Sequence, residues 1–411
     1  MRLRPEPVSP AGVHLCHVAD ALAASWEPGA AQRDRTGRFD PAVVLDIHLA
    51  GLAGGTVPVE LGGGGLDQLA DLMAIIHRLA EADGSLALVV QMHLSGIWSL
   101  ARAWRAEPDP ERADLLASVA AGSAWLCAAV TEAGTNFFHP RTVLRARVGG
   151  GWQLHGTKIF ATGSPAATHF SANSRIEGGR FDGRLAQVVV PADTAGVRVE
   201  DTWDGLGMRA SGSGAVHFDS VDLGPSTIVQ PGGRYGQFSS GALCGRAFGN
   251  VGNVSAMAGL ASAAASLART RVATGGGPGG TPLAQRATVR QALAGLHTDA
   301  YALNAVIGHL GRRADEVAGA LRDNPASLSE AAGREFMAEF QAAKLNVNRL
   351  AAAIVDAALA LAGGSGYTSA DPLGRLARDV RAGVFMQPFS PHEGLGFIGS
   401  VVAGVDPDVL A

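Results

Sequence analysis

The stretch "LAGGSGYTSADPLGRLARDVRAG", Leu361 to Gly383, divides a long apolar segment from a short basic one. Upstream of it, apolar residues recur at spacings of three and four, the period of an amphipathic helix: Phe336, Phe340, Ala343, Val347, Leu350, Ile354, Ala358 and Leu361. The pattern stops at Gly363 and Gly364, and glycine is common where helices end because it has no Cβ. The sequence therefore predicts a bundle helix that ends at this glycine pair.

The rest of the chain divides into three blocks by the period of its apolar residues. Residues 1–123 carry helical spacings. Residues 124–232 change to a period of two, in short β-branched runs separated by Gly, Pro and Asp, which predicts an antiparallel β-sandwich or barrel. Residues 233–411 return to helical spacings. The fold class expected from this order is α+β, with a β domain between two helical domains.

Composition restricts the kinds of partner. The 411 residues are 47% hydrophobic and 17% charged, and 33 Lys+Arg stand against 37 Asp+Glu, so we expect a compact globular protein without a nucleic-acid surface. The cysteines Cys16, Cys127 and Cys244 are far apart, which predicts neither a disulfide framework nor a metal site. The N-terminus lacks an apolar signal core and no run reads as a membrane span. We expect a cytoplasmic protein without membrane contact.

Four segments, taken in order, carry a family resemblance: "LCAAVTEAGTNFF", "LHGTKIFATGSP", "WDGLGMRASGSGAVHFDSVDL" and "ALALAGGSGYTSADPLGRLARDVRAG". Each resembles a motif of the acyl-CoA dehydrogenase family of flavoproteins. The resemblance implies an N-terminal helical domain, a middle β domain and a C-terminal four-helix bundle. It also implies a homodimer or homotetramer with FAD bound between the β domain and the bundle, its adenosine end reaching a neighbouring subunit.

The resemblance also implies which residues hold the cofactor. Val130 and Thr131 match positions that hold the flavin ring, Phe160 replaces an aromatic residue that stacks beside it, and Thr162 matches a hydroxyl near N5. The residues matched to the diphosphate and to the neighbour's adenosine are Arg271, Gly363 and Gly364. Two plainer readings stay open: Phe160 as a core residue, and Arg271 as a helix-end cation with Arg269 as its competitor. The charged residues that follow predict a structural ion cluster: Arg375, Arg378, Asp379 and Arg381.

The leading functional hypothesis is FAD-dependent α,β-dehydrogenation of an acyl thioester. An electron-transfer flavoprotein is one candidate partner, and the sequence leaves the electron acceptor open. This chemistry needs a base for the α-proton, and the family supplies a Glu from one of two positions. Here those positions hold Gln387 and Gly245, and neither has a carboxylate. The hypothesis therefore needs Glu393, in the pair "EG", to take the role of the base.

The alternative is a two-component flavin-dependent monooxygenase that hydroxylates a small organic substrate. Such relatives receive reduced flavin from a separate flavin reductase and often use histidines in this region. His392 and His93 are then the candidate catalytic residues. A third reading also stays open, in which Glu393 and His392 lie in an exposed loop and take no part in catalysis.

Overall fold

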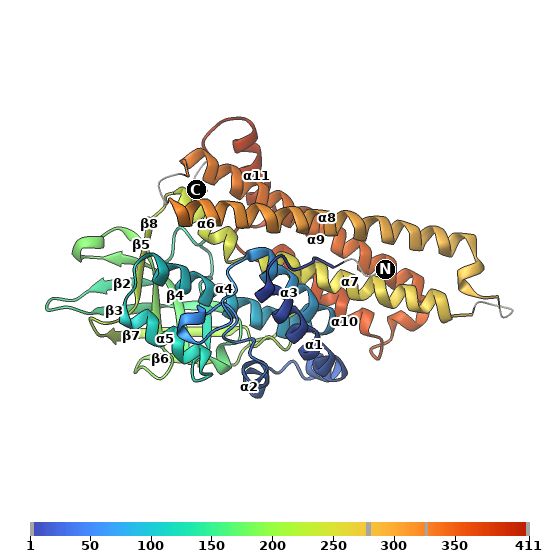
Figure 1. Ribbon diagram of the computed structural model, residues 1–411, viewed down its shortest axis with the longest axis horizontal. Helices are drawn as coiled ribbons and strands as arrows, with labels where there is room; N and C mark the ends of the chain where they lie inside the picture. Colours follow the sequence, from blue (N-terminus) through green and yellow to red (C-terminus); the bar gives the residue numbers. More distant parts are fainter. Residues whose placement is uncertain (1–3, 277–280, 325–327, 408–411) are drawn as a thin grey trace.

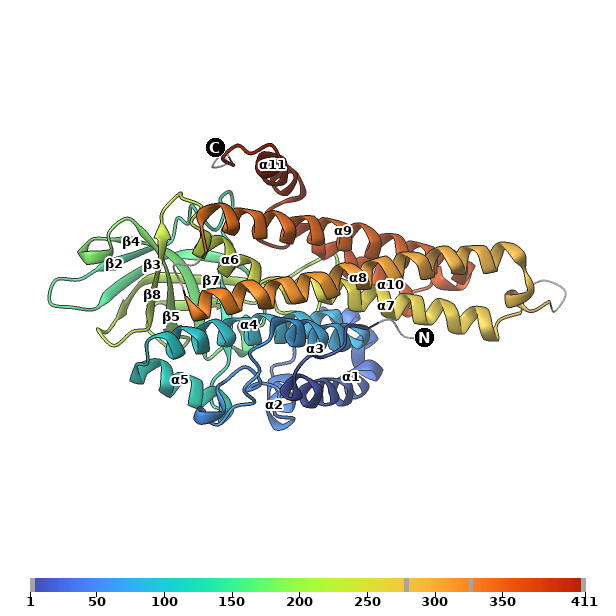
Figure 2. The same cartoon turned by 45° about the horizontal axis from the view of Figure 1, so that its top comes forward.

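The structure is a computed structural model that describes residues 4–276, 281–324 and 328–407. Three parts follow one another along the chain (Figure 1). A β-sheet lies at one end of the molecule, a long bundle of C-terminal helices runs away from it, and the N-terminal helices pack along the bundle beside the sheet (Figure 2). The predicted α–β–α order is confirmed.

The N-terminal part is helical. Its α-helices are α1 (Pro10–Thr36), α2 (Ala42–Leu49), α3 (Leu69–Ala82), α4 (Gly84–Ala106) and α5 (Pro110–Ala120). Helix α3 is buried almost throughout, because it packs between α1 on one side and α7 of the bundle on the other. This part of the chain therefore shares one hydrophobic core with the C-terminal helices.

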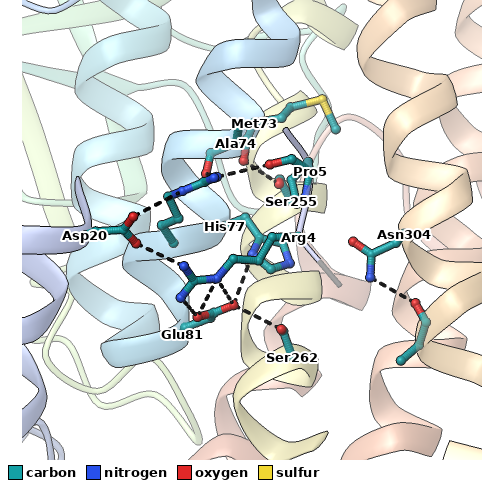
Figure 3. A network of polar contacts seen from close by, with 12 residues as sticks. Arg4, Pro5, Asp20, Met73, Ala74, His77, Glu81, Ser255, Ser262 and Asn304 are labelled. Atoms are coloured by element: carbon teal, nitrogen blue, oxygen red, sulfur yellow. Dashed lines mark hydrogen bonds and ion pairs between the residues drawn. The ribbon is translucent and has the colours of Figure 1, made fainter. Parts of the chain in front are cut away.

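A polar network joins the N-terminal segment to the bundle (Figure 3). Arg4 Nε donates to Glu81 Oε1 at 2.9 Å, and Ser262 Oγ of α7 donates to the same oxygen at 3.0 Å. Ser255 Oγ donates to the carbonyl of Met73 at 2.6 Å. These bonds satisfy polar groups at a helix interface that is otherwise apolar, and they fix the position of α3 along α7.

The middle part is one sheet of eight strands, in the order β6-β7-β3-β2-β4-β5-β8, with β1 also paired to β4. The strands are β1 (Leu126–Ala129), β2 (Val143–Ala146), β3 (Trp152–Ala161), β4 (His169–Glu177), β5 (Arg184–Pro191), β6 (Val197–Glu200), β7 (Gly214–Leu223) and β8 (Val229–Arg234). The expected antiparallel arrangement is wrong along one side of β4, an interior strand, because β1 and β2 both run parallel to it. Strand β8 also ends two residues beyond the predicted boundary at 232.

The C-terminal part is helical. Its α-helices are α6 (Ser240–Phe248), α7 (Val251–Thr274), α8 (Ala287–Asp323), α9 (Glu330–Ala362), α10 (Pro372–Asp379) and α11 (Pro391–Val402). The predicted end of α9 is confirmed: Gly363 follows it with a φ of 62°, a conformation that favours glycine. A short 3₁₀ segment, Gly363–Tyr367, then leads to α10.

Within the described residues, three helical segments are long and apolar enough to cross a membrane by length and composition: Gly84–Ala106, Ser240–Thr274 and Glu330–Tyr367. Most of the apolar 18-residue stretch in each of the first two is buried inside the protein, whereas 33% of the corresponding stretch in the third is buried. Packing within the fold accounts for the apolar character of the first two. The expectation of no membrane contact stays a prediction.

Candidate active site

A cavity of about 540 Å³ lies where the sheet meets α4, α6 and the segment after α10. Its walls are mainly apolar, with Met92 of α4, Trp203 of the loop before β7 and Met386 near the C-terminus among them. A few polar side chains converge between these apolar walls. A concave site of this size and lining is typical of a small-molecule or cofactor pocket.

The structure brings four of the residues predicted to contact the flavin ring to this cavity. Val130 and Thr131 follow β1, and Phe160 and Thr162 lie at the end of β3. The Thr162 hydroxyl lies 3.0 Å from the hydroxyl of Ser213, so its orientation is set by a second buried side chain. The fold therefore places two distant sequence motifs on one wall, as a common ligand requires.

Phe160 has an unusual backbone. Its φ is 56°, and a left-handed conformation costs a residue with a Cβ about 1–2 kcal/mol. The pairing of β3 with β7 shifts register between Lys158 and Ala161, so the strand turns here. Phe160 is 56% exposed, and its ring meets the Trp203 ring edge-on, with centroids 5.9 Å apart. Strain of this kind is common at binding sites, and here it presents an aromatic face to the cavity.

A buried ion pair supports the wall behind Thr131. Lys158 Nζ lies 2.5 Å from Glu132 Oε1, and both side chains are almost completely buried. Glu132 also accepts hydrogen bonds from the backbone N–H groups of Arg141 and Thr142. Burial lowers the pKa of Lys158 to about 8, against the opposing attraction of Glu132. The pair is charged at neutral pH and ties β3 to the turn after β1.

The predicted ion cluster around Asp379 connects the β domain to the bundle. Asp379 Oδ1 accepts from the backbone N–H of Met208 at 2.7 Å, and Met208 has a φ of 52°. Burial raises the pKa of Asp379 to about 7, while Arg375 acts in the opposite direction. The guanidinium of Arg378 forms two bonds to the carboxylate of Asp34, at 2.8 and 2.6 Å. The cluster therefore holds a strained loop of the cavity wall against α10.

Gln387, at one of the usual base positions, lies in the cavity wall. Its Nε2 donates to Thr131 Oγ1 at 3.5 Å, and its buried Oε1 has no donor among the described residues. Lys344 of α9 holds the backbone on either side of Gln387, because its Nζ donates to the carbonyls of Met386 and Phe389. Burial lowers the pKa of Lys344 to about 8, with Glu393 acting to raise it.

The predicted catalytic residues do not line this cavity. Glu393 belongs to a capping box at the start of α11, where its Oε2 accepts from the backbone N–H of Ser390 at 2.7 Å, and His392 is exposed beside it. His93 is buried and stacks on Trp125 with ring centroids 3.8 Å apart. Its Nδ1 accepts from the N–H of Leu126 and its Nε2 donates to a backbone carbonyl. Burial lowers the pKa of His93 to about 4, so it is a neutral residue of the core.

Three further predicted cofactor residues lie outside the cavity. Arg271, near the end of α7, forms an ion pair with Asp371, the residue that caps α10. Gly363 and Gly364 are exposed, and a Cβ added at either would meet open space. Helix α7 carries Arg271 toward the end of the bundle that lies away from the sheet (Figure 1). Their proposed contact with a neighbour's cofactor stays a prediction.

The charged residues that line the cavity are all positive. Among the described residues that line it there is no Asp, Glu, His or Lys, and the charged residues are Arg246, Arg378 and Arg381. Arg378 and Arg381 are paired with Asp34 and Asp356. Arg246 has no ion pair in the described part of the chain; its guanidinium lies 4.2 Å from the Phe137 ring and its Nε is buried without a partner. Burial lowers the pKa of Arg246 to about 10.

Sequence reasoning did not assign Arg246 a role, although a signal was present. Arg246 directly follows Gly245, one of the two positions at which relatives carry a base. Gly245 has no reactive group, so the position alone does not point to the arginine beside it. In the structure both residues line the cavity, so the motif does mark the site.

Comparison with protein families gives three matches, which together span most of the chain. Residues 16–107 match the acyl-CoA dehydrogenase N-terminal domain, residues 127–221 the middle domain, and residues 251–390 a C-terminal domain of the same family.

Individual relatives are similar over the whole chain. L-evernosamine nitrososynthase of a Micromonospora species is 38% identical, covering 98% of this chain and 93% of the relative. Amino sugar nitrososynthase DnmZ of Streptomyces peucetius is 34% identical, covering 97% and 95%. The X-ray structure of KijD3 in complex with FMN and a dTDP-linked amino keto sugar has a TM-score of 0.88 at 35% identity, covering 98% of this chain and 96% of KijD3.

Proposed function

This chain belongs to the acyl-CoA dehydrogenase family of flavoproteins, and we propose that it is a flavin-dependent oxygenase that oxidises the amino group of a nucleotide-linked sugar. The identity to two amino sugar nitrososynthases over nearly the full chain supports this reaction class. The chain is a flavin-dependent oxidoreductase of this family in either case. The reaction proposed here replaces the leading hypothesis of thioester dehydrogenation.

One observation carries the proposal: the described lining of the cavity holds no carboxylate and no histidine. Dehydrogenation of a thioester requires a base within hydrogen-bond reach of the α-proton. Gln387 and Gly245 occupy the usual base positions in the cavity, and Glu393 is engaged in the cap of α11. Oxygenation of an amine needs no such base, because the nitrogen lone pair is itself the nucleophile.

A reduced flavin supplies the electrons that activate dioxygen. In each round one oxygen atom goes to the nitrogen and the other leaves as water, with two electrons from the flavin. A first round converts the primary amine to a hydroxylamine, and a second converts it to a nitroso group with loss of water. A separate flavin reductase is the proposed source of reduced flavin.

The residues of the cavity fit a flavin. The exposed Phe160 ring offers a stacking face, and the Thr131 and Thr162 hydroxyls lie on the same wall. The sequence predicted FAD, but KijD3 was solved with FMN, so we propose that the site binds FMN or FAD. The residues assigned to the adenosine end of FAD, Arg271 and the glycine pair Gly363–Gly364, lie outside this cavity.

We expect Phe160→Ala to weaken flavin binding. The stacking lost is worth about 0.5–1.5 kcal/mol beyond the area removed, or roughly a twofold to tenfold rise in Kd. Fluorescence titration with FMN and FAD measures this directly. Phe181→Ala is the control, since this partly buried ring packs against the sheet core and does not line the cavity. Equal affinity of Phe160→Ala and the native protein for both flavins would contradict the assignment.

The reaction itself is tested by turnover. The protein is mixed with a flavin reductase, NADH, FMN or FAD, and a dTDP-linked amino sugar in air, and products are followed by mass spectrometry. The proposal expects hydroxylamine and nitroso products. A parallel anaerobic arm mixes the oxidised holoenzyme with acyl-CoA thioesters, where no flavin bleaching is expected. Bleaching by a thioester, without N-oxidation in the first arm, would restore the dehydrogenase hypothesis.

A further inference from the structure

Three side-chain amides in the cavity wall share one feature. Asn173, Asn253 and Gln387 each use the amide NH₂ group in a bond to the protein, to Phe137 O, Asn250 Oδ1 and Thr131 Oγ1 respectively. In each, the amide oxygen is buried without a donor among the described residues. Buried acceptors without partners are rare in folded proteins, because each costs about 1–3 kcal/mol. The cavity therefore offers acceptors to a ligand that brings N–H or O–H groups.

The backbone on either side of Gln387 is bound by a lysine of α9. The Lys344 ammonium donates to the carbonyl of Met386, directly before Gln387, and to that of Phe389, at 2.6 Å, two residues after it. Phe389 is itself buried against Phe397, with ring centroids 5.3 Å apart. The backbone that carries Gln387 is thus fixed at the position where dehydrogenases of the family carry a carboxylate.

The charged residues of the cavity lining disfavour a cation. Arg246 contributes a positive charge from α6 that no carboxylate in the described structure neutralises. Arg378 and Arg381, from α10 and the segment after it, are paired with Asp34 and Asp356. Outside the lining, Lys158 is paired with Glu132. The carboxylate of Glu393 attracts the Lys344 ammonium and acts to raise its pKa. No carboxylate lines the cavity to receive an ammonium ion, within the residues described.

From these contacts we infer that the cavity selects the neutral form of the substrate amine, with Gln387 accepting a hydrogen bond from its N–H and Arg246 repelling the ammonium form. The inference rests on the proposed function and specifies the protonation state of the substrate amine. A neutral amine keeps the lone pair that attacks oxygen, whereas an ammonium ion has none. Glutamine serves better than glutamate here, because a carboxylate would stabilise the unreactive cation.

The test is the pH dependence of binding and of turnover for Gln387→Glu. The probe is the dTDP-linked amino keto sugar bound in KijD3, titrated by calorimetry into the FMN-loaded protein from pH 6 to 9. The native protein is expected to bind more tightly as the pH rises to the amine's own pKa. With Gln387→Glu the trend reverses, and the rising limb of kcat, which reports ionisations in the bound complex, moves up by about one to three pH units, the shift typical of a close opposite charge.

Two further variants separate charge from shape. Gln387→Met removes the acceptor without adding charge, so we expect a KM several-fold higher, at least about threefold, with the pH limb unmoved. Gln237→Glu adds the same charge on the exposed surface outside the cavity, and its profile is expected to match the native one. Flavin absorbance of each variant reports whether the site is intact.

Two failures are distinguishable. Native binding that does not change with pH, together with a Gln387→Glu profile that superimposes on it, would overturn the inference even if the amine is oxidised. Native protein that binds the neutral amine with the expected pH dependence, but yields no N-oxidised product with reduced flavin and air, would overturn the proposed function and leave the inference standing.

Discussion

Lys158→Met is expected to destabilise the protein by about 3–5 kcal/mol, the usual cost of removing one partner of a buried ion pair. The Lys158 side chain is 0% exposed and its Nζ lies 2.5 Å from Glu132 Oε1, so the substitution leaves a carboxylate buried with only backbone donors. Denaturant unfolding monitored by circular dichroism gives the midpoint and slope. Because Thr131 precedes Glu132, flavin binding is expected to weaken as well.

The double variant Glu132→Gln/Lys158→Met tests the cause. Removing both charges is expected to recover part of the lost free energy of unfolding, because the double variant no longer buries an unpaired charge. A single variant Lys158→Met whose free energy of unfolding lies within about 1 kcal/mol of the native protein would contradict the structural role of the pair.

Lys344→Met is expected to impair catalysis more than flavin binding. The substitution leaves the carbonyls of Met386 and Phe389 without their charged donor, at a cost of about 1–3 kcal/mol each. The segment that carries Gln387 then loses its fixed position, while Phe160 and Thr162 on β3 keep theirs. We expect the yield of N-oxidised product per NADH consumed to fall by about tenfold, a change equivalent to 1.4 kcal/mol. The electrons from NADH that do not reach the product are expected to reduce dioxygen to hydrogen peroxide.

Lys344→Arg is the matched control, because a guanidinium keeps donors for both carbonyls. We expect it to restore part of the yield of N-oxidised product per NADH. Peroxide assay and product quantification on the same samples measure both outputs. If Lys344→Met gave the native yield of product per NADH together with native flavin affinity, the bonds from Lys344 to the backbone beside Gln387 would have no part in catalysis.

The fold could be predicted from the sequence where local periods are strong. The stripe from Phe336 to Leu361 and the glycine pair defined α9 and its end, since a buried helix face repeats at 3.6 residues. The parallel pairing of β1 and β2 with β4 could not be predicted. Both strands lie in succession along one edge of β4, and this arrangement depends on the connection between them rather than on any period of two.

The site could be predicted in part. The residues that the resemblance matches to the flavin ring, such as Thr131 and Phe160, line one cavity, and so does Gln387, which the resemblance matches to a base position. Glu393 shows what was missed. "SPHE" is a capping-box pattern, with a Ser three residues before a Glu, and it explains the carboxylate without catalysis.

His93 could not be interpreted from local sequence. Its helix, α4, is buried on several faces, so helical period does not say which side chain meets a cavity. Only the tertiary structure brings Trp125 against its ring and occupies both ring nitrogens with backbone groups. Arg246 illustrates the opposite case, in which a cation that sequence leaves unremarked becomes notable because the fold gives it no carboxylate.

The central claim is that this flavoprotein transfers oxygen to an amine. The most direct measurement is turnover of the dTDP-linked amino sugar with a flavin reductase under dioxygen labelled with the heavy oxygen isotope, followed by mass spectrometry of the product. We expect the oxygen on the sugar nitrogen to come from labelled dioxygen, in both the hydroxylamine and the nitroso product. An unmodified amine, with the label recovered only in hydrogen peroxide and water, would contradict it.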